Sequence, residues 1–452
     1  MKTMRLIFSS LFLLIGITSL TAQNIEGYWK GTLNAAGTEL VLGFDISATA
    51  DGYTATLDVP QQSLYKMPVT VTFDSLNLKI EMKQFNAIYE GMFVINSFAG
   101  KYTQNGMSFP LNLAKGEREA LKRPQTPQPP FPYHSENVIF TNTKENFTLA
   151  GTLTVPQGKG PFPAVVLISG SGSQNRDEEL MGHKPFAVLS DYLTRNGIAV
   201  LRYDDRGVGE SGNGNPGGNS LDLSYDAEAA FDYLKSNKDI NTSKIGLIGH
   251  SEGGVINYMV AERRSDVAFI VSLAGPSITG IQTLRVQLKK LLEVSGLAPE
   301  AQQSYLGLYY TVLDMIESSS DNTPELQKSI KDKLLSVGLP EDQAAKMVSE
   351  YTNPWMYYFL KYDPSDNIIK VNCPALLLNG SKDRQVVAEI NIPAYKAIAE
   401  KYGKTNMTIC EIPDLNHLFQ HCQTGAPTEY STIEETISPA VLQMIADFIN
   451  NL

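Results

Sequence analysis

Cysteine is scarce in this sequence of 452 residues, where it occurs at Cys373, Cys410 and Cys422 only. Three thiols cannot build the dense disulfide framework of a small secreted scaffold, and an odd number leaves at least one thiol unpaired. Cys410 and Cys422 stand about a dozen residues apart, a loop length that a disulfide can close. The spacing leaves two alternatives open, a bridge between these two residues or two independent buried thiols.

Positive charge is also in short supply, because 37 lysines and arginines face 48 aspartates and glutamates and give a net charge of −11. Such a chain is a poor partner for nucleic acid or for an anionic membrane surface. The five histidines form no histidine–carboxylate cluster at metal-ligand spacing, and the sequence has no G-x-x-x-x-G-K-[ST] phosphate loop. We therefore expect no metal, no cofactor and no nucleic-acid partner.

A long apolar run stands at the N-terminus, where basic residues precede a stretch from Leu6 to about Leu20. This pattern is typical of a secretory signal peptide, residues 1–22, with cleavage near Ala22. A membrane anchor is the alternative, but the run is short for a span and no basic stop-transfer cluster follows it. The sequence therefore predicts an exported protein, periplasmic or extracellular, with no integral membrane span after cleavage.

The segment over residues 24–118 alternates apolar and polar side chains with a period of two. Ala55 and Leu57, for example, alternate with threonines, and turn dipeptides such as Asn105–Gly106 separate the runs. We expect roughly seven or eight antiparallel strands in a small barrel or sandwich. The opening stretch IEGYWKGTL resembles the first strand of lipocalin-like barrels, so the domain would hold an apolar ligand or, more simply, have a structural or orienting role.

The stretch KRPQTPQPPFP follows and predicts an extended, semi-rigid, proline-rich linker over residues 119–134. From residue 135 to 452, apolar runs alternate with helical patterns, and FTLAGTLTVP near the start predicts a hairpin pair. The alternation is typical of an α/β fold, a mostly parallel sheet with helices on both faces and ligands beyond the carboxyl ends of the strands. Residues 276–370 add a long helical insertion. We expect it to form a cap over the site, and a peripheral decoration is the alternative.

The stretch KIGLIGHSEGG places a polar tripeptide between an apolar strand and an amphipathic helix. It contains the pattern G-x-S-x-G, with Ser251 between Gly249 and Gly253. The glycines remove Cβ atoms that would clash where strand and helix almost touch, and the sharp turn lifts the serine above the sheet edge. The N-terminus of the following helix suits a developing oxyanion. We therefore expect Ser251 to act as a nucleophile.

A serine nucleophile needs a base, and the base needs an orienting carboxylate. His417 ends the last strand–loop segment and is the expected base, with His421 as the alternative. Asp383 follows the apolar stretch ALLLNG and is the expected carboxylate. Asp204 and Asp205 precede the serine and stand in DDRGVGESG, which we expect to be a turn held by a carboxylate–arginine pair. His250 adjoins the nucleophile, and we expect its side chain to point away and to pack or bond locally.

The chain order serine, acid, histidine, together with the motifs VVLISGSG, YDDRGVGESG, GHSEGG, NGSKDRQV and DLNH, resembles the α/β-hydrolase superfamily from about residue 135 onward. The resemblance implies an α/β-hydrolase fold. It also implies Ser251 as nucleophile, His417 as general base and then general acid, and Asp383 as the orienting carboxylate.

The resemblance further implies an oxyanion hole made by the backbone N–H of Glu252 and one N–H from the loop Gly170–Gly172. The His-Gly usual in that loop is replaced here by Ser169–Gly170, and Ser171 is our choice for the second donor. Within the superfamily, GSGSQNRDE looks similar to secreted bacterial esterases of the dienelactone-hydrolase-like and serine-aminopeptidase-like groups. The implied function is a serine hydrolase that cleaves a small carboxylic ester.

Two other functions stay open. A serine peptidase or aminopeptidase of the same fold is the first, because the double glycine of GHSEGG also occurs in prolyl-oligopeptidase-like enzymes. The short N-terminal domain, which cannot be a propeller, and the lack of an evident acidic pair for a peptide N-terminus weigh against it. The second is a ligand-binding protein with a vestigial hydrolase domain. The complete triad weighs against that alternative.

Overall fold

The structure, a computed structural model, describes residues 24–35, 38–50, 52–62, 64–118, 122–214 and 218–452. The chain divides after residue 120 into two compact units. The predicted signal peptide, residues 1–22, lies outside the described residues and stays a prediction. In the part of the chain that is described, no helix has both the length and the apolar character needed to cross a membrane.

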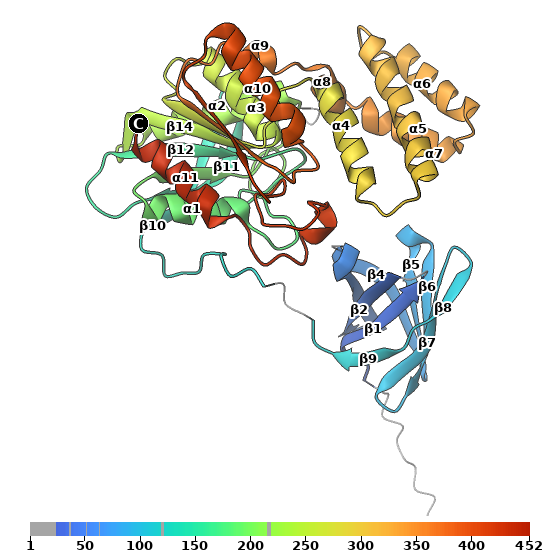
Figure 1. Cartoon of the computed structure of the whole chain (residues 1–452). Helices are drawn as coiled ribbons and strands as arrows, with labels where there is room; N and C mark the ends of the chain where they lie inside the picture. Colours follow the sequence, from blue (N-terminus) through green and yellow to red (C-terminus); the bar gives the residue numbers. More distant parts are fainter. Residues whose placement is uncertain (1–23, 36–37, 51, 63, 119–121, 215–217) are drawn as a thin grey trace, which may run out of the picture. The chain divides into compact units, whose positions relative to one another are not determined.

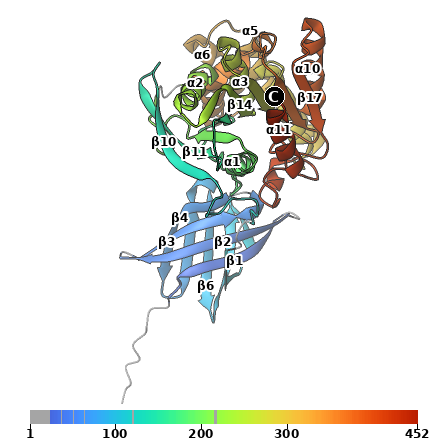
Figure 2. The same cartoon turned by 90° about the vertical axis from the view of Figure 1, so that its left-hand side faces the viewer.

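The first unit is an antiparallel β-barrel (Figures 1 and 2). Its nine described strands follow the order β6-β5-β4-β3-β2-β1-β9-β7-β8, and β6 also pairs with β7, which closes the sheet. The predicted number of strands was too low because β8 and β9 have four residues each, too few for an alternating pattern to be visible. The elements are β1 Gly27–Ala35, β2 Thr38–Thr49, β3 Gly52–Val59, η1 Pro60–Gln62, β4 Leu64–Asp74, β5 Asn77–Met82, η2 Lys83–Phe85, β6 Ala87–Val94, β7 Ser97–Gln104, β8 Met107–Pro110 and β9 Leu113–Gly116.

Aromatic side chains pack in the interior of the barrel. The ring centroids of Trp29 and Phe98 are 4.8 Å apart in an edge-on arrangement, and Phe93 lies 5.2 Å from Phe98. Phe44 and Tyr89 are fully buried in the same cluster. Because these side chains occupy the interior, a structural or orienting role for this domain is favoured over the binding of an apolar ligand.

The second unit contains an eight-stranded sheet in the order β10-β11-β13-β12-β14-β15-β16-β17. β10 and β11 pair with each other, and β11 with β13, in antiparallel fashion; every pairing beyond them is parallel. This is the predicted α/β-hydrolase fold. The strands are β10 His134–Asn142, β11 Phe147–Val155, β12 Phe162–Ile168, β13 Ala199–Tyr203, β14 Ile240–His250, β15 Phe269–Leu273, β16 Ala375–Gly380 and β17 Met407–Ile412.

The predicted hairpin within FTLAGTLTVP is wrong, because that stretch is the single strand β11. Its antiparallel partner is β10, and the turn between them falls at residues 143–146. Gly151 does not mark a turn; it stands where the backbone of β13 passes closely, and a Cβ there would lie 2.6 Å from the carbonyl oxygen of Arg202.

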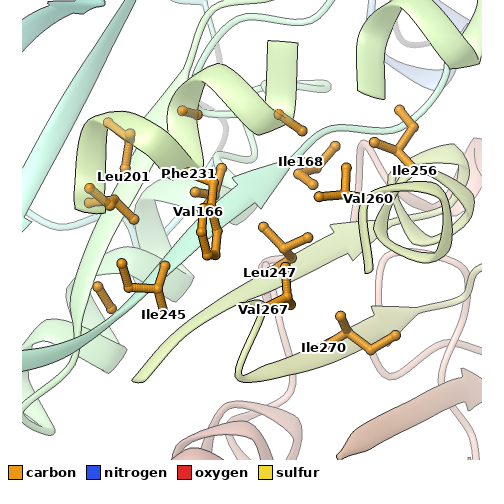
Figure 3. Packing of buried hydrophobic residues seen from close by; sticks show 14 of the residues in the cluster. Val166, Ile168, Leu201, Phe231, Ile245, Leu247, Ile256, Val260, Val267 and Ile270 are labelled. Atoms are coloured by element: carbon orange, nitrogen blue, oxygen red, sulfur yellow. The ribbon is translucent and has the colours of Figure 1, made fainter. Parts of the chain in front are cut away.

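Helices cover both faces of the sheet. Successive side chains of a strand point to opposite faces, so Val166 and Ile168 of β12 pack with residues of α2 and α3, as Figure 3 shows, whereas Val165 and Leu167 pack with residues of α1 and α11. The helices are α1 Pro185–Arg195, α2 Ser220–Ser236, α3 Glu252–Arg263, α10 Ala388–Tyr402, η3 Pro427–Glu429 and α11 Pro439–Asn450. The sheet is therefore buried between two apolar cores, and its strand ends are left for the site.

The insertion between β15 and β16 is helical, and Figure 1 shows most of its helices gathered beside the sheet. It has a core of its own, in which Val312, Leu313 and Ile316 of α5 meet Ile330 and Leu334 of α6. Its helices are α4 Gly280–Glu293, α5 Pro299–Ser318, α6 Pro324–Ser336, α7 Glu341–Tyr351, α8 Pro354–Lys361 and α9 Ser365–Ile368.

The proline-rich segment, predicted to be an extended, semi-rigid spacer, makes hydrogen bonds to residues that are distant in the chain. Arg123 donates to the carbonyl of Met181 at 2.8 Å and to that of Ser431 at 3.0 Å, and Gln125 donates to the carbonyl of Ile437 at 2.7 Å. Because the side chains of Arg123 and Gln125 donate to these backbone carbonyls, this part of the predicted linker lies against residues of the second unit. Residues 119–121 lie outside the described residues.

Cys373, Cys410 and Cys422 are free thiols, each partly exposed. The bridge between Cys410 and Cys422 is therefore absent, and the alternative of independent thiols is confirmed, although neither is fully buried. The Cys422 thiol instead donates to the carbonyl of Asp414 at 3.6 Å.

Candidate active site

Ser251 stands at the turn between β14, which ends at His250, and α3, which begins at Glu252. Its φ of 53° and ψ of −117° lie in a sparsely populated region for a residue with a side chain, which is a mark of functional turns. A Cβ on Gly249 would lie 2.0 Å from the carbonyl oxygen of Gly253, and a Cβ on Gly253 would lie 2.1 Å from that of Ile168. The two glycines therefore permit the close packing that holds the turn.

Asp383 and His417 come from the loops that follow β16 and β17. The Nδ1 atom of His417 lies 2.7 Å from Oδ2 of Asp383, and both side chains are buried. The other oxygen of Asp383 accepts from the backbone N–H groups of Gln385 at 2.8 Å and Val386 at 2.9 Å. The carboxylate is thus fixed by the chain around it. With Nδ1–H donating to Asp383, Nε2 of a neutral His417 is free to accept a proton.

Ser251 and His417 line the same cavity, which has a volume of about 360 Å³. It is lined by Gly170, Ser171, Gln174, Glu178, Leu180, His250, Ser251, Glu252, Pro276, Thr283, Leu284, Gln287, Trp355, Met356, Phe359, Gln385, Val386, His417 and Leu418. The loops after β12, β14 and β17 contribute residues to it, as does the cap through α4 and α8. The site therefore lies beyond the carboxyl ends of the parallel strands, where this fold binds its ligands.

Both residues predicted as oxyanion donors, Glu252 and Ser171, line this cavity. Glu252 is the first residue of α3, where backbone N–H groups have no partner inside the helix. In the loop after β12, the N–H of Gly170 donates to Oε1 of Glu178 at 2.7 Å. Because that donor is engaged, the geometry favours Ser171 over Gly170 as the second donor.

The alternative carboxylates have other partners. Asp205 accepts from the hydroxyl of Ser169 at 2.8 Å and from the N–H of Gln174 at 2.9 Å. Asp204 pairs with Arg176 at 2.6 Å. Carboxylate–arginine pairs hold the turn DDRGVGESG, as expected, but their other members lie outside this stretch: Arg206 pairs with Asp226 of α2 and with Glu145 in the β10–β11 turn.

Burial raises the pKa of Asp205 to about 7, although the donors Gln174 and Ser169 act in the opposite direction. Between about pH 4 and pH 7 the folded protein therefore binds a proton that the unfolded chain does not, and stability falls as pH rises through this window. Replacing Asp205 with asparagine removes that ionisation. Between pH 5 and pH 8 we expect the stability of the variant relative to the wild type to rise by about 2.7 kcal/mol.

Urea unfolding of both proteins at pH 5, 6, 7 and 8 measures this difference. Asp447→Asn, a change of the same kind at an exposed helix position, is the control and should show little dependence on pH. A stability difference between Asp205→Asn and wild type that stays constant over this range would show that Asp205 ionises normally.

The remaining histidines do not reach Asp383. His421 is exposed and pairs with Glu435 at 2.8 Å. His250 was expected to pack or to bond locally. It is buried, but its bonds are not local: its Nδ1 atom lies 2.9 Å from Oε1 of Glu178, and its Nε2 atom lies 3.0 Å from the carbonyl oxygen of His417. Tertiary contacts, invisible in the sequence around His250, bring these partners together. Nothing in the stretch GSGSQNRDE other than its position signals the role of Glu178.

The cap supplies one wall of the cavity. Among the aromatic residues of the cap, Trp355 lines the cavity, whereas Tyr309 and Tyr310 pack against the core of the cap itself. Tyr358 does not line the cavity but stacks on Tyr362. Met356 and Phe359, which the sequence did not single out, complete the wall.

The side chain of Glu252 connects the cap to the nucleophile turn. Its Oε1 atom accepts from the indole N–H of Trp355 at 2.9 Å and from the hydroxyl of Ser220 at 2.6 Å. Burial raises the pKa of this carboxyl above its ordinary value. Trp355 is thereby held at the edge of the cavity beside Ser251.

No three histidine, cysteine, aspartate or glutamate side chains within the described ranges are placed to hold a metal ion. What the cavity does contain is a serine, a histidine with an orienting carboxylate, and backbone donors at a helix N-terminus. This set of groups can carry out acyl transfer to a serine hydroxyl.

Parts of this chain are similar to known proteins. Esterase EstD of Thermotoga maritima is 29% identical over 283 residues, which are 62% of this chain and 61% of that esterase. Acyl-coenzyme A amino acid N-acyltransferase 2 of Mus musculus is 32% identical over 139 residues, 30% of this chain and 29% of the mouse protein. The chain thus spans less than two thirds of the length of these relatives. The solved structure of the Pyrococcus furiosus esterase PF2001 covers 71% of this chain and 91% of its own, with 16% identity and a TM-score of 0.44.

The sequence profile of the family described as serine aminopeptidase, S33, matches residues 183–421, more than half of the chain. The match includes Ser251, Asp383 and His417, the three residues that the geometry brings together. With the α/β-hydrolase sheet and the nucleophile turn in place, this chain belongs to the S33 serine aminopeptidase family.

Proposed function

We propose that this protein is an exported serine hydrolase that cleaves carboxylic esters through an acyl-enzyme on Ser251. The observation that carries the proposal is the cavity in which a strained serine at a helix N-terminus meets a histidine held by a buried aspartate. Export rests on the predicted signal peptide alone. The substrate would be a small-molecule ester with an apolar acyl group, because Leu284, Met356 and Phe359 of the cap face the cavity.

The mechanism follows from the hydrogen bond between Nδ1 of His417 and Asp383, which leaves Nε2 of His417 as the proton acceptor. Nε2 of His417 takes the proton of Ser251 as the hydroxyl oxygen attacks the ester carbonyl, and Asp383 stabilises the imidazolium that forms. The N–H groups of Glu252 and Ser171 stabilise the oxyanion. His417 then gives its proton to the departing alkoxide. A water molecule, activated by the same histidine, attacks the acyl-enzyme and releases the acid.

A peptide bond is the competing target, and the family to which the chain belongs favours it. Glu178 and Glu252 are the acidic residues of the cavity lining. Oε1 of Glu178 contacts Gly170 and His250, and Oε1 of Glu252 accepts from Ser220 and Trp355, whereas Oε2 of Glu252 is buried without a hydrogen-bond partner. The similarity to an esterase favours an ester instead.

The test is a panel of p-nitrophenyl esters beside aminoacyl-anilides, together with labelling by a fluorophosphonate probe. Turnover of esters at rates well above those of the anilides, with labelling of Ser251, supports the proposal. Faster turnover of the anilides would replace it with a peptidase. No turnover and no label would support the third alternative, a ligand-binding protein with a vestigial hydrolase domain.

Phe359 is predicted to limit the length of the acyl group, since its ring faces the cavity and stacks on Trp355 at 6.0 Å between centroids. Phe359→Ala should raise the ratio of kcat/KM for longer acyl chains to kcat/KM for acetate by roughly 10-fold, the effect of admitting one or more methylenes. Steady-state kinetics on p-nitrophenyl esters of increasing length measure this ratio. Tyr305→Ala, at an exposed position of α5, is the control and should leave the ratio unchanged; no shift in Phe359→Ala would place the acyl group elsewhere.

A further inference from the structure

Glu178 and His250 form a buried contact at the base of the cavity that the mechanism above does not use. The loop after β12 carries Glu178, with an unusual φ of 50°, and β14 ends at His250. Glu178 and His250 are only 6% and 7% exposed. One oxygen of Glu178 accepts from two donors, the N–H of Gly170 at 2.7 Å and Nδ1 of His250 at 2.9 Å.

The other ring nitrogen of His250 reaches the loop of the general base. Its Nε2 atom lies 3.0 Å from the carbonyl oxygen of His417, and the two imidazole rings are 4.8 Å apart between centroids. A carbonyl oxygen can only accept, so Nε2 of His250 carries a hydrogen. Nδ1 faces a carboxylate oxygen that already accepts from Gly170. A doubly protonated, positively charged His250 satisfies all of these contacts.

We propose that Glu178 and His250 are an ion pair of positioning residues that holds the oxyanion loop and the general-base loop in register around Ser251. Glu178 fixes Gly170, the residue before the oxyanion donor Ser171. His250 fixes the backbone of His417. The proposal rests on the roles assigned above to Ser251, Ser171 and His417, and it explains how this loop is held where relatives have His-Gly.

The charges around the pair agree with this arrangement. Burial opposes a charge on His250, but the Glu178 carboxylate, the His417 carbonyl and Asp383 together outweigh it, and the pKa of His250 lies above its ordinary value. Asp383 acts on His250 in the same direction. Glu178 also acts on the buried Asp205, and Glu252 lines the same cavity. Among these groups, Glu178 is the carboxylate that directly contacts His250.

Substitution of His250 and substitution of Glu178 should have different effects on the pH profile of kcat/KM. In His250→Gln the buried Glu178 carboxylate loses its cation. Its negative charge, close to His417, then stabilises the protonated form of His417. The acid limb of kcat/KM should then move to higher pH. Glu178→Gln removes the anion itself, so no such upward displacement is expected. A purely structural defect would lower kcat/KM at every pH and displace neither limb.

The experiment compares kcat, KM, pH profile and fluorophosphonate labelling rate for wild type, Glu178→Gln, His250→Gln and the double variant. We expect each single variant to lose about 10- to 100-fold in kcat with little change in KM, less than the roughly 10²–10³-fold loss typical of removing an oxyanion donor. The double variant should lose no more than the worse single variant, because the two residues act as a unit.

Glu179→Gln is the matched control, because the neighbouring Glu179 is exposed, pairs with Lys184 and does not line the cavity. It should behave as wild type. Thermal unfolding verifies that each variant is folded, and if Glu178→Gln fails to fold, His250→Gln decides by its pH profile. Wild-type kcat and profile in both variants, or losses in them that are fully additive, would overturn the proposal. An unreactive wild type would instead refute the proposed function.

Discussion

Replacing Ser251 with alanine is expected to lower kcat by on the order of 10⁴-fold or more and to leave the protein folded. The hydroxyl oxygen forms the covalent bond to the acyl group, and the methyl group of alanine cannot replace it. Alanine keeps the Cβ atom and the backbone N–H that donates to Leu273 at 2.8 Å, so the turn between β14 and α3 should persist.

Ester turnover, fluorophosphonate labelling and thermal unfolding of Ser251→Ala check this result. Ser265→Ala, in the exposed turn after α3, is the control and should be indistinguishable from wild type. Wild-type turnover by Ser251→Ala would show that the whole site assignment is wrong. Loss of turnover together with loss of folded protein would call for Ser251→Cys, which changes the nucleophile and keeps the volume of the side chain nearly constant.

The second large effect is expected at the acid–base pair. His417→Ala should lose nearly as much kcat as Ser251→Ala, because no other imidazole can take the serine proton. Asp383→Asn should lose somewhat less: an amide nitrogen facing Nδ1 favours the tautomer with its hydrogen on Nε2, which cannot act as the base. The Oδ1 bonds from Gln385 and Val386 can be kept by the amide oxygen, so the loop should stay in place.

The three residues should also behave as one unit. The double variants Ser251→Ala/His417→Ala and Ser251→Ala/Asp383→Asn should be barely slower than Ser251→Ala, because the remaining groups have nothing to act on. Additive losses would contradict a shared mechanism. Asp205→Asn is the comparison for Asp383→Asn and should lose far less activity. A comparable loss at Asp205 with none at Asp383 would reassign the orienting carboxylate.

Much of the fold could be predicted from the sequence, because local patterns determine the strands and helices of a parallel sheet. The apolar runs that became β12 to β16 are largely buried on both faces, so they are visible in the sequence as short apolar stretches. The G-x-S-x-G pattern identified the nucleophile turn for the same reason. Gly249 is demanded by its contact with Gly253, four residues further along the chain, whereas Gly253 is demanded by the close approach of Ile168 from β12. Patterns failed where the element was short, as at β8 and β9, or where a glycine served a neighbouring strand, as at Gly151.

What the sequence by itself determined, then, is the identity of the groups that local geometry fixes: Ser251 on its turn, and an acid and a histidine at the ends of later strands. What only the tertiary structure decided is which side chains meet across the loops. Glu178 contacts His250 across 72 residues, and His250 contacts His417 across 167. Trp355 reaches Glu252 across 103. Hydrogen bonds of this kind depend on the distance in space between loops, or between a loop and the cap. No periodicity or spacing along the chain contains that distance.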